Sequence, residues 1–385
     1  MMENERPDSR ITSIQLLRIV LCIGVFNGHF FGICMPHGSI GREFLSILRN
    51  GWLSRTVLCF WHRGDANVFI FFIISGFFIA YTLTDLSLSN SDMLKKLFKR
   101  TMNILLPSAI VILTTAFIYY LFNKIGFLGE GGEECLFNKE EIIKDLKGLV
   151  YGGNTIPYYA YQLWYIRVLL QVYVRGFFFQ VILRRLAFPI RLLVYSICVL
   201  ASVSKLNVTY FALFTGMLVA EITTVAKTKI GTIKFTYVKL AAVFAIIVAP
   251  FTYNEDNLSD VNAIIFEACM VLFILMICIL EMKYSIAINQ NIKKAINRLD
   301  VNSFAFYLLH VLVLNIFSRQ FYNYFITSWG MEWDYLIVAM DYIVTFCVIW
   351  ILSNVFENYI IKNINRFILS ILNIGDLLIM RRKKY

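Results

Sequence analysis

Two ionisable side chains lie in the first long apolar segment of the sequence. Arg18 and His29 are eleven residues apart, which in an α-helix corresponds to three turns plus about 20° and ~16 Å along the axis. Both side chains would therefore lie on one helix face, with Cys22 on the same stripe and Gln15 beside it. A neutral imidazole can act as a general base or a nucleophile, and a guanidinium can bind a phosphate group.

Structural roles would also suit both residues. His29 could form a hydrogen bond to a neighbouring helix, and Arg18 could extend to the inner membrane interface. Ionisable residues inside a membrane span are costly and often functional. Because the two side chains share one face, we favour a joint functional role for them.

Further polar candidates occur later in the chain. Ser303, Tyr307 and His310 fall within an arc of about 60° on one predicted helix, and for His310 we favour a bond between helices. Arg167 follows an aromatic pair that includes Trp164, which is typical of a membrane-interface belt. Two acidic residues within predicted spans could serve as counter-charges for the intramembrane arginines, namely Glu267 and Asp341.

The composition indicates the kind of fold that must position these residues. The chain has 385 residues, of which 59% are hydrophobic and only 16% charged, whereas soluble domains are less apolar and more charged. We therefore predict an all-α polytopic membrane protein with about ten transmembrane helices. The predicted spans are 14–36, 65–84, 103–122, 160–183, 188–204, 208–226, 239–253, 261–281, 303–326 and 335–360.

The charge pattern predicts the orientation. The net charge is +11, and most Lys and Arg residues fall in loops on one side, which places the N- and C-termini in the cytoplasm. No nucleic-acid recognition module is present. The predicted outer loop 37–64 carries four arginines; it could bind an anionic head group, re-enter the membrane or, as we favour, form an interfacial amphipathic segment.

Other sequence features give little sign of a soluble active site. The eight cysteines include no CxxC pair, so we expect no metal site; a disulfide between Cys59 and Cys135 is weakly supported. The dipeptide Ser75-Gly76 lacks the flanking glycine of a nucleophile elbow, so close helix packing is the favoured role. Residues 1–361 are interpreted as the membrane domain, and residues 362–385 as a basic amphipathic cytoplasmic tail.

Five motifs occur in order along the chain. They are RITSIQLLR (10–18) followed by His29, VFIFFIISGF (68–77), the basic run before Pro107, LWYIR (163–167) and SFAFYLLH (303–310). Together they resemble the membrane acyltransferase-3 family, which O-acylates cell-surface polysaccharides and related glycans. Two departures stand out: the family has an acidic residue at the place of Gln15, and its paired arginines before the third helix appear as Arg100 and Asn103.

The resemblance implies an integral membrane O-acyltransferase in a bacterial inner or plasma membrane. Acetyl-CoA would be the cytoplasmic acyl donor, and a glycan or lipid-linked sugar hydroxyl the acceptor, with membrane lipids as further partners. His29 and Arg18 would be catalytic. The cations on the donor phosphates would be Lys96, Lys99 and Arg100; residues with substrate or structural roles would be Ser75, Trp164, Arg167, Tyr307 and His310.

Two other functions fit part of the pattern. A secondary transporter or flippase of glycans or lipids could use Arg18, Glu267 and Asp341 as coupling or substrate charges, although no inverted repeat is evident. A non-catalytic membrane subunit on the same fold would tolerate the loss of His29. The sequence leaves the acceptor sugar, the acyl group and the oligomeric state open.

Overall fold

The protein is described by a computed structural model. The described residues are 12–31, 64–83, 88–125, 138–151, 157–205, 207–228, 260–284, 290–330 and 333–382, with isolated positions between 236 and 245. Most of the 37–64 loop, Cys59, Cys135 and most of the predicted span 239–253 lie outside these residues.

Every regular element in the described residues is a helix, which confirms the predicted all-α class. The helices are α1 (Thr12–His29), α4 (Gly64–Leu83), α5 (Asn90–Lys124), α6 (Lys139–Tyr151), α7 (Leu163–Leu183), α8 (Phe188–Ser204), α9 (Val208–Thr228), α11 (Asp260–Tyr284), α12 (Gln290–Val313), η4 (Leu314–Ser318), α13 (Arg319–Trp329), α14 (Asp334–Phe356), η6 (Glu357–Ile361) and α15 (Lys362–Arg382).

Seven helical segments in this described part are long and apolar enough to cross a membrane, and two more apolar helices are shorter. The two shorter ones correspond to α4 and α8. These helices support an integral membrane protein. The count of ten spans and the cytoplasmic position of both termini stay predictions.

Two helices extend well beyond the spans predicted from hydropathy. α5 starts at Asn90, where the Ser89 hydroxyl accepts a hydrogen bond from the backbone N–H of Asp92, so the basic run 95–100 is helical and not a loop. Helix also continues without a break from Gln290 to Trp329 through the π-helical turn η4. Hydropathy misses these extensions because their first turns are polar.

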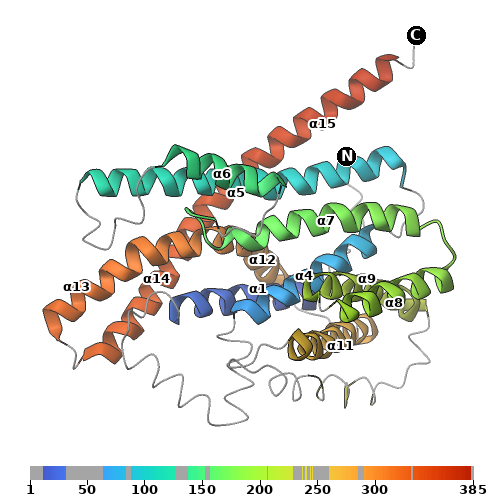
Figure 1. The fold of residues 1–385 in the computed structure, drawn as a ribbon, viewed down its shortest axis with the longest axis horizontal. Coiled ribbons are helices and arrows are strands. Elements are labelled where there is room, and N and C mark those ends of the chain that lie inside the picture. Colours follow the sequence, from blue (N-terminus) through green and yellow to red (C-terminus); the bar gives the residue numbers. More distant parts are fainter. Residues whose placement is uncertain are drawn as a thin grey trace. The chain divides into compact units, whose positions relative to one another are not determined.

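The chain divides into two compact units. The first contains α1, α4, α8, α9, α11 and the beginning of α12 up to Ser303, and the second contains α5, α6, most of α7 and the chain from Phe304 onward. Within the first unit, α4 packs along α9, α9 also contacts α8 and α11, and α1 contacts α4 and α11 (Figure 1).

Glycines bring α4 and α9 into backbone contact. A Cβ atom placed on Gly76 would overlap the carbonyl oxygen of Leu213, and one placed on Gly216 would overlap the carbonyl oxygen of Ile73. Small residues at such positions let helix backbones approach each other in membranes. The packing role predicted for the Ser75-Gly76 dipeptide is therefore confirmed for its glycine.

In the second unit, α5 contacts both α6 and α15, and α13 packs against α14. Figure 1 shows α6 lying beside α5. α15 follows α14 through the π-helical turn η6, and Tyr359 and Phe367 are exposed. α15 (Lys362–Arg382) is thus helical, and the boundary of the tail and its location at a membrane interface stay predictions.

Candidate active-site residues and family membership

A carboxylate from α11 caps the N-terminus of α1. The backbone N–H groups of Thr12 and Ser13 donate to Glu281 at 2.7 and 2.8 Å, and the Ser13 hydroxyl donates to the same carboxylate. The first N–H groups of a helix lack partners within the helix, and the helix dipole favours a negative charge there. Glu281 therefore fixes the end of the helix that carries Arg18 and His29.

The polar stripe of α1 continues one turn later. Arg18 Nη1 lies 3.1 Å from Asp300 Oδ1, and its side chain is 25% exposed while that of Asp300 is 9% exposed. Nη1 also donates to Asp300 Oδ2 at 3.2 Å, and Gln15 Nε2 donates to the same oxygen at 3.2 Å. Asp300, near the middle of α12, is thus the counter-charge of Arg18.

Cys22 extends the stripe by another turn. Its thiol donates to the carbonyl oxygen of Ser303 at 3.2 Å, and the Ser303 hydroxyl donates to the carbonyl oxygen of Asp300 at 2.6 Å. Gln15, Arg18 and Cys22 therefore all face one turn of α12, which confirms the prediction that they share a face. This arrangement also gives Ser303 a structural role, because its hydroxyl donates a hydrogen bond to the backbone of its own helix.

His29 is the last residue of α1 and is half-buried. Phenylalanines lie on both sides of His29 in the sequence. The rings of Phe26 and Phe30 are tilted with 5.8 Å between centroids, and Phe30 meets Phe31 edge-on at 5.3 Å. His29 lies ~16 Å along the helix axis from Arg18. The two candidate catalytic residues are therefore held far apart along one short helix.

Two further polar residues of the first unit, Ser75 and Glu267, differ in their hydrogen bonding. The Ser75 hydroxyl donates to the carbonyl oxygen of Phe71 at 2.8 Å within its own helix, which is a structural contact. Glu267 on α11 is fully buried, and neither of its carboxylate oxygens has a hydrogen-bond partner in the described part of the chain.

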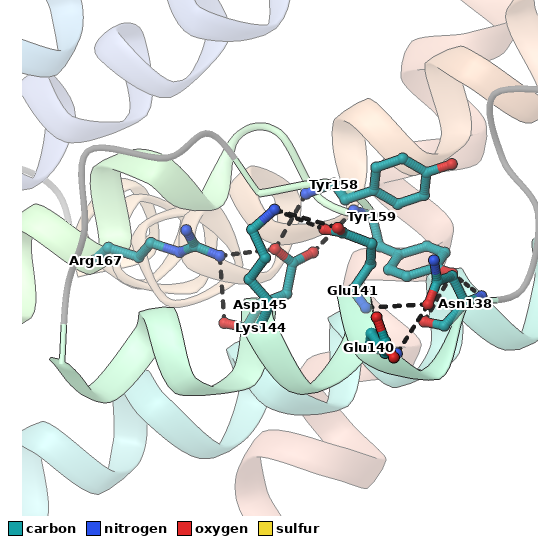
Figure 2. A network of polar contacts seen from close by, with 8 residues as sticks. All are labelled: Asn138, Glu140, Glu141, Lys144, Asp145, Tyr158, Tyr159 and Arg167. Atoms are coloured by element: carbon teal, nitrogen blue, oxygen red, sulfur yellow. Dashed lines mark hydrogen bonds and ion pairs between the residues drawn. The ribbon is translucent and has the colours of Figure 1, made fainter.

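The second unit contains a buried ion pair between α6 and α7, drawn in Figure 2. Arg167 Nη2 lies 2.9 Å from Asp145 Oδ1, and the two side chains are 1% and 2% exposed. The backbone N–H groups of Tyr158 and Tyr159 also donate to this carboxylate, at 3.1 and 2.9 Å. Gly148 leaves room for the guanidinium, because a Cβ there would lie 2.5 Å from Cζ of Arg167.

The start of α6 belongs to the same network. The Asn138 side chain accepts hydrogen bonds from the backbone of Glu140 and Glu141, which caps the helix. The backbone N–H of Asn138 donates to the Tyr159 hydroxyl at 2.7 Å (Figure 2). The segment before α7 is thus attached to α6 at two points, through Asp145 and through Asn138.

The motif residues of α7 and α12 also meet in the second unit. Gln162 Nε2 donates to the carbonyl oxygen of Leu308 at 2.7 Å, and the Tyr307 hydroxyl donates to the carbonyl oxygen of Gln162 at 2.5 Å. Tyr165 packs edge-on against Tyr307 at 5.6 Å, and His310 Nδ1 lies 2.6 Å from the carbonyl oxygen of Tyr307. These contacts join the two helices and favour a structural role for His310.

The candidate donor-binding cations lie in the first turns of α5. Lys96 and Arg100 are exposed and Lys99 is half-buried, and positions 96, 99 and 100 share one helix face. Arg100 lies over the ring of Tyr173 with 6.0 Å between Cζ and the ring centroid. Trp164 is half-buried and meets Tyr165 edge-on at 6.5 Å.

The expected counter-charges were wrong for two arginines. Arg18 pairs with Asp300, and Arg167 pairs with Asp145. Asp341 instead accepts hydrogen bonds from Ser318 and Thr345 at 2.6 and 2.8 Å. The Arg167 guanidinium is buried in its ion pair, and the interface position of the aromatic pair before it stays a prediction.

Sequence reasoning missed both aspartates. Asp300 lies in a polar stretch between two predicted spans, where the sequence predicts a loop. Asp145 lies on the buried face of α6 with Ile142 and Leu149, and this spacing of three and four residues is a helical signal. An aspartate on an apolar helix face could have been recognised as needing a buried partner.

The candidate residues fall into both units. Arg18, His29 and Ser75 belong to the first, and the other seven belong to the second: Lys96, Lys99, Arg100, Trp164, Arg167, Tyr307 and His310. The profile of the acyltransferase-3 family, described as an acyltransferase domain, matches residues 11–354. The chain belongs to the acyltransferase-3 family.

The range matched by the acyltransferase-3 family profile includes all five motifs except their first residue, Arg10. Family membership identifies the protein as a membrane acyltransferase and agrees with the apolar helices. No curated protein and no solved structure matched the chain.

Proposed function

We propose that this acyltransferase transfers an acyl group, with acetyl as the favoured group, from cytoplasmic acyl-CoA to a hydroxyl of a cell-surface or lipid-linked glycan. The observation that carries the proposal is the family match over residues 11–354. The polar face of α1 supports it, because Arg18 and His29 lie on the first matched helix. The proposed location is a bacterial plasma membrane.

The acyl donor is a thioester that carries several phosphates, so its site needs cations and hydrogen-bond donors. In the proposal, Lys96, Lys99 and Arg100 on α5 attract these phosphates at the cytoplasmic side. Arg18 contacts the donor from α1. The exposed positions of Lys96 and Arg100 are compatible with this role.

In the proposed reaction, the acceptor hydroxyl oxygen attacks the carbonyl carbon of the thioester. A C–O bond forms, the C–S bond breaks, the hydroxyl proton passes to His29 as general base, and coenzyme A leaves as a thiolate that takes up a proton. His29 can alternatively accept the acyl group on a ring nitrogen and pass it on to the hydroxyl. The covalent route suits a donor and an acceptor on opposite sides of the membrane.

Replacement of His29 by alanine tests the proposal. If His29 is the base or the acyl carrier, His29→Ala should lower acyl transfer per mole of folded protein by ~10²–10⁴. The measurement is transfer of labelled acetyl from acetyl-CoA to surface glycans in membranes, followed by mass spectrometry. Thermal unfolding is recorded in parallel.

His310→Ala is the matched control, because His310 is buried and bonded within its own helix. We expect it to lower stability while the folded protein keeps most of its activity. Near-normal turnover by the His29 variant would reject the mechanism. No acyl transfer by the wild-type protein to any glycan would reject the proposed acceptor class.

A further inference from the structure

The Asp300 carboxylate contacts two residues of α1, and both hydrogen bonds from them go to its Oδ2. The carboxylate contacts Arg18 through both oxygens, at 3.1 and 3.2 Å, and also accepts a hydrogen bond from Gln15 at 3.2 Å. Gln15 and Arg18 are one helical turn apart on the same face of α1. One carboxylate thus holds two successive positions of the polar stripe.

The surroundings fix the position of this carboxylate. The Ser303 hydroxyl donates to the carbonyl oxygen of Asp300 at 2.6 Å, and the Cys22 thiol donates to the carbonyl oxygen of Ser303 at 3.2 Å. At the N-terminus of α1, Glu281 of α11 accepts hydrogen bonds from the backbone of Thr12 and Ser13. α1 therefore cannot slide or rotate relative to α12 without the loss of several polar contacts.

The partial exposure of Arg18 shows why such a support is needed. The side chain is 25% exposed, whereas Asp300 is 9% exposed, so the guanidinium extends toward an accessible region from a largely buried partner. A long cationic side chain in a membrane helix without a counter-charge turns toward the nearest water interface. Asp300 opposes that movement.

We infer that Asp300 is a positioning residue that holds the Arg18 guanidinium where the acyl donor must pass, with Gln15 orienting the carboxylate. The inference rests on the proposed function. Misplacement of a substrate-binding group by about 1 Å can cost up to 10²-fold in rate. The effect of Asp300 is thus exerted through Arg18, and Asp300 itself touches no substrate.

An isosteric exchange of charge between positions 15 and 300 tests the inference. Asp300→Asn removes the charge and keeps the shape, and the double variant Gln15→Glu/Asp300→Asn returns a carboxylate one turn from Arg18. In the double variant, the amide introduced at position 300 can donate to the carboxylate introduced at position 15, so the existing contact is reversed and kept. Gln15→Glu alone and Glu141→Gln, an acid-to-amide change in an exposed i,i+3 pair with Lys144, serve as controls.

For each variant, kcat and the KM for acetyl-CoA are measured per mole of folded protein, with thermal unfolding in parallel. We expect Asp300→Asn to lower kcat/KM at least tenfold, mainly through KM, because Arg18 is no longer held in place. The double variant should recover kcat/KM to within about threefold of wild type. Glu141→Gln should leave both constants unchanged.

Three results would overturn the inference. Unchanged kcat/KM in Asp300→Asn would show that the ion pair is only structural. A lower KM would show that the carboxylate competes with the donor phosphates. Failure of the double variant to recover activity, with normal unfolding, would show that the charge near Arg18 is not what matters. If the wild-type protein transfers no acyl group, it is the proposed function that fails, before the variants are compared.

Discussion

One helix pair in each compact unit illustrates a different kind of contact. In the first unit, α4 and α9 meet through the backbone at Gly76 and Gly216, and side chains take no part in the closest contact. In the second unit, α6 and α7 are joined by the buried pair of Asp145 and Arg167 together with backbone N–H groups.

This difference separates two kinds of intramembrane arginine. Arg167 is surrounded by partners and nearly inaccessible, so its charge is used for the fold. Arg18 is 25% exposed and pairs with Asp300, and its role toward a ligand stays a proposal. A charged residue in an apolar helix is therefore a functional candidate only after its burial and its partner are known.

The largest expected effect is on the polar network of the second unit. Asp145→Ala leaves the Arg167 guanidinium buried without its counter-charge, and we expect a loss of ~3–5 kcal/mol in the free energy of unfolding. Thermal and denaturant unfolding of the purified protein measure this loss. Lys144→Ala is the control, since that side chain is 55% exposed and should change stability by no more than ~0.5 kcal/mol. Equal stability of both variants would contradict a structural role for the network.

The second effect tests the backbone contact of the first unit. Gly76→Leu adds a side chain where even a Cβ overlaps the Leu213 carbonyl oxygen, so α4 and α9 must separate. We expect a loss of ~1–3 kcal/mol in unfolding free energy, as is typical of overpacked sites. Ser75→Ala, next to it, should have little effect because its hydroxyl bonds only its own helix. A stable Gly76→Leu protein would show that the contact is not needed.

A smaller effect concerns the accessible cations of the second unit, which contrast with the buried Arg167. Reversal of charge in Lys99→Glu/Arg100→Glu should weaken acetyl-CoA binding about tenfold, equivalent to ~1.4 kcal/mol, and leave expression unchanged. Direct binding to the purified protein is the measurement, with Lys144→Glu as control. Unchanged affinity would move the donor site away from α5, to Arg18 alone.

The smallest expected effect concerns Glu267. It is buried in α11 with no hydrogen bond to its carboxylate from the described residues, so Glu267→Gln breaks no ion pair with any of them. We expect acyl transfer within about twofold of wild type and no loss of unfolding free energy, because the exchange keeps the shape of the side chain and removes no hydrogen bond to the described residues. Strong loss of acyl transfer in a stable Glu267→Gln protein would contradict this expectation and give the carboxyl a role in the reaction.

The sequence predicted well which residues of α1 form the polar stripe in the first unit. The spacing of Gln15, Arg18 and Cys22 predicted a common face, since an α-helix turns 100° per residue, and all three face α12 in the structure. The partner could not be predicted, because Asp300 is 282 residues from Arg18. Such a pairing depends on how distant helices pack, which a local pattern does not encode.

The second unit was predicted less well. α6 has only 13 residues, too few for a span, so a hydropathy search passes over it and leaves Arg167 without an obvious partner. Its buried face shows a helical period in Ile142, Asp145 and Leu149, but the loop interpretation took precedence. Short amphipathic helices between spans are thus where sequence reasoning about this fold fails first.

The contact between α4 and α9 also has a consequence for how the chain is made. The two contacting positions, Gly76 and Leu213, are separated by about 140 residues, which a ribosome adds in roughly 7–28 s at 5–20 residues per second. α4 is therefore synthesised long before α9 exists, and its glycine surface lacks this partner in the meantime. Assembly of the first unit must wait for the second half of translation, with α5, α6 and α7 already synthesised.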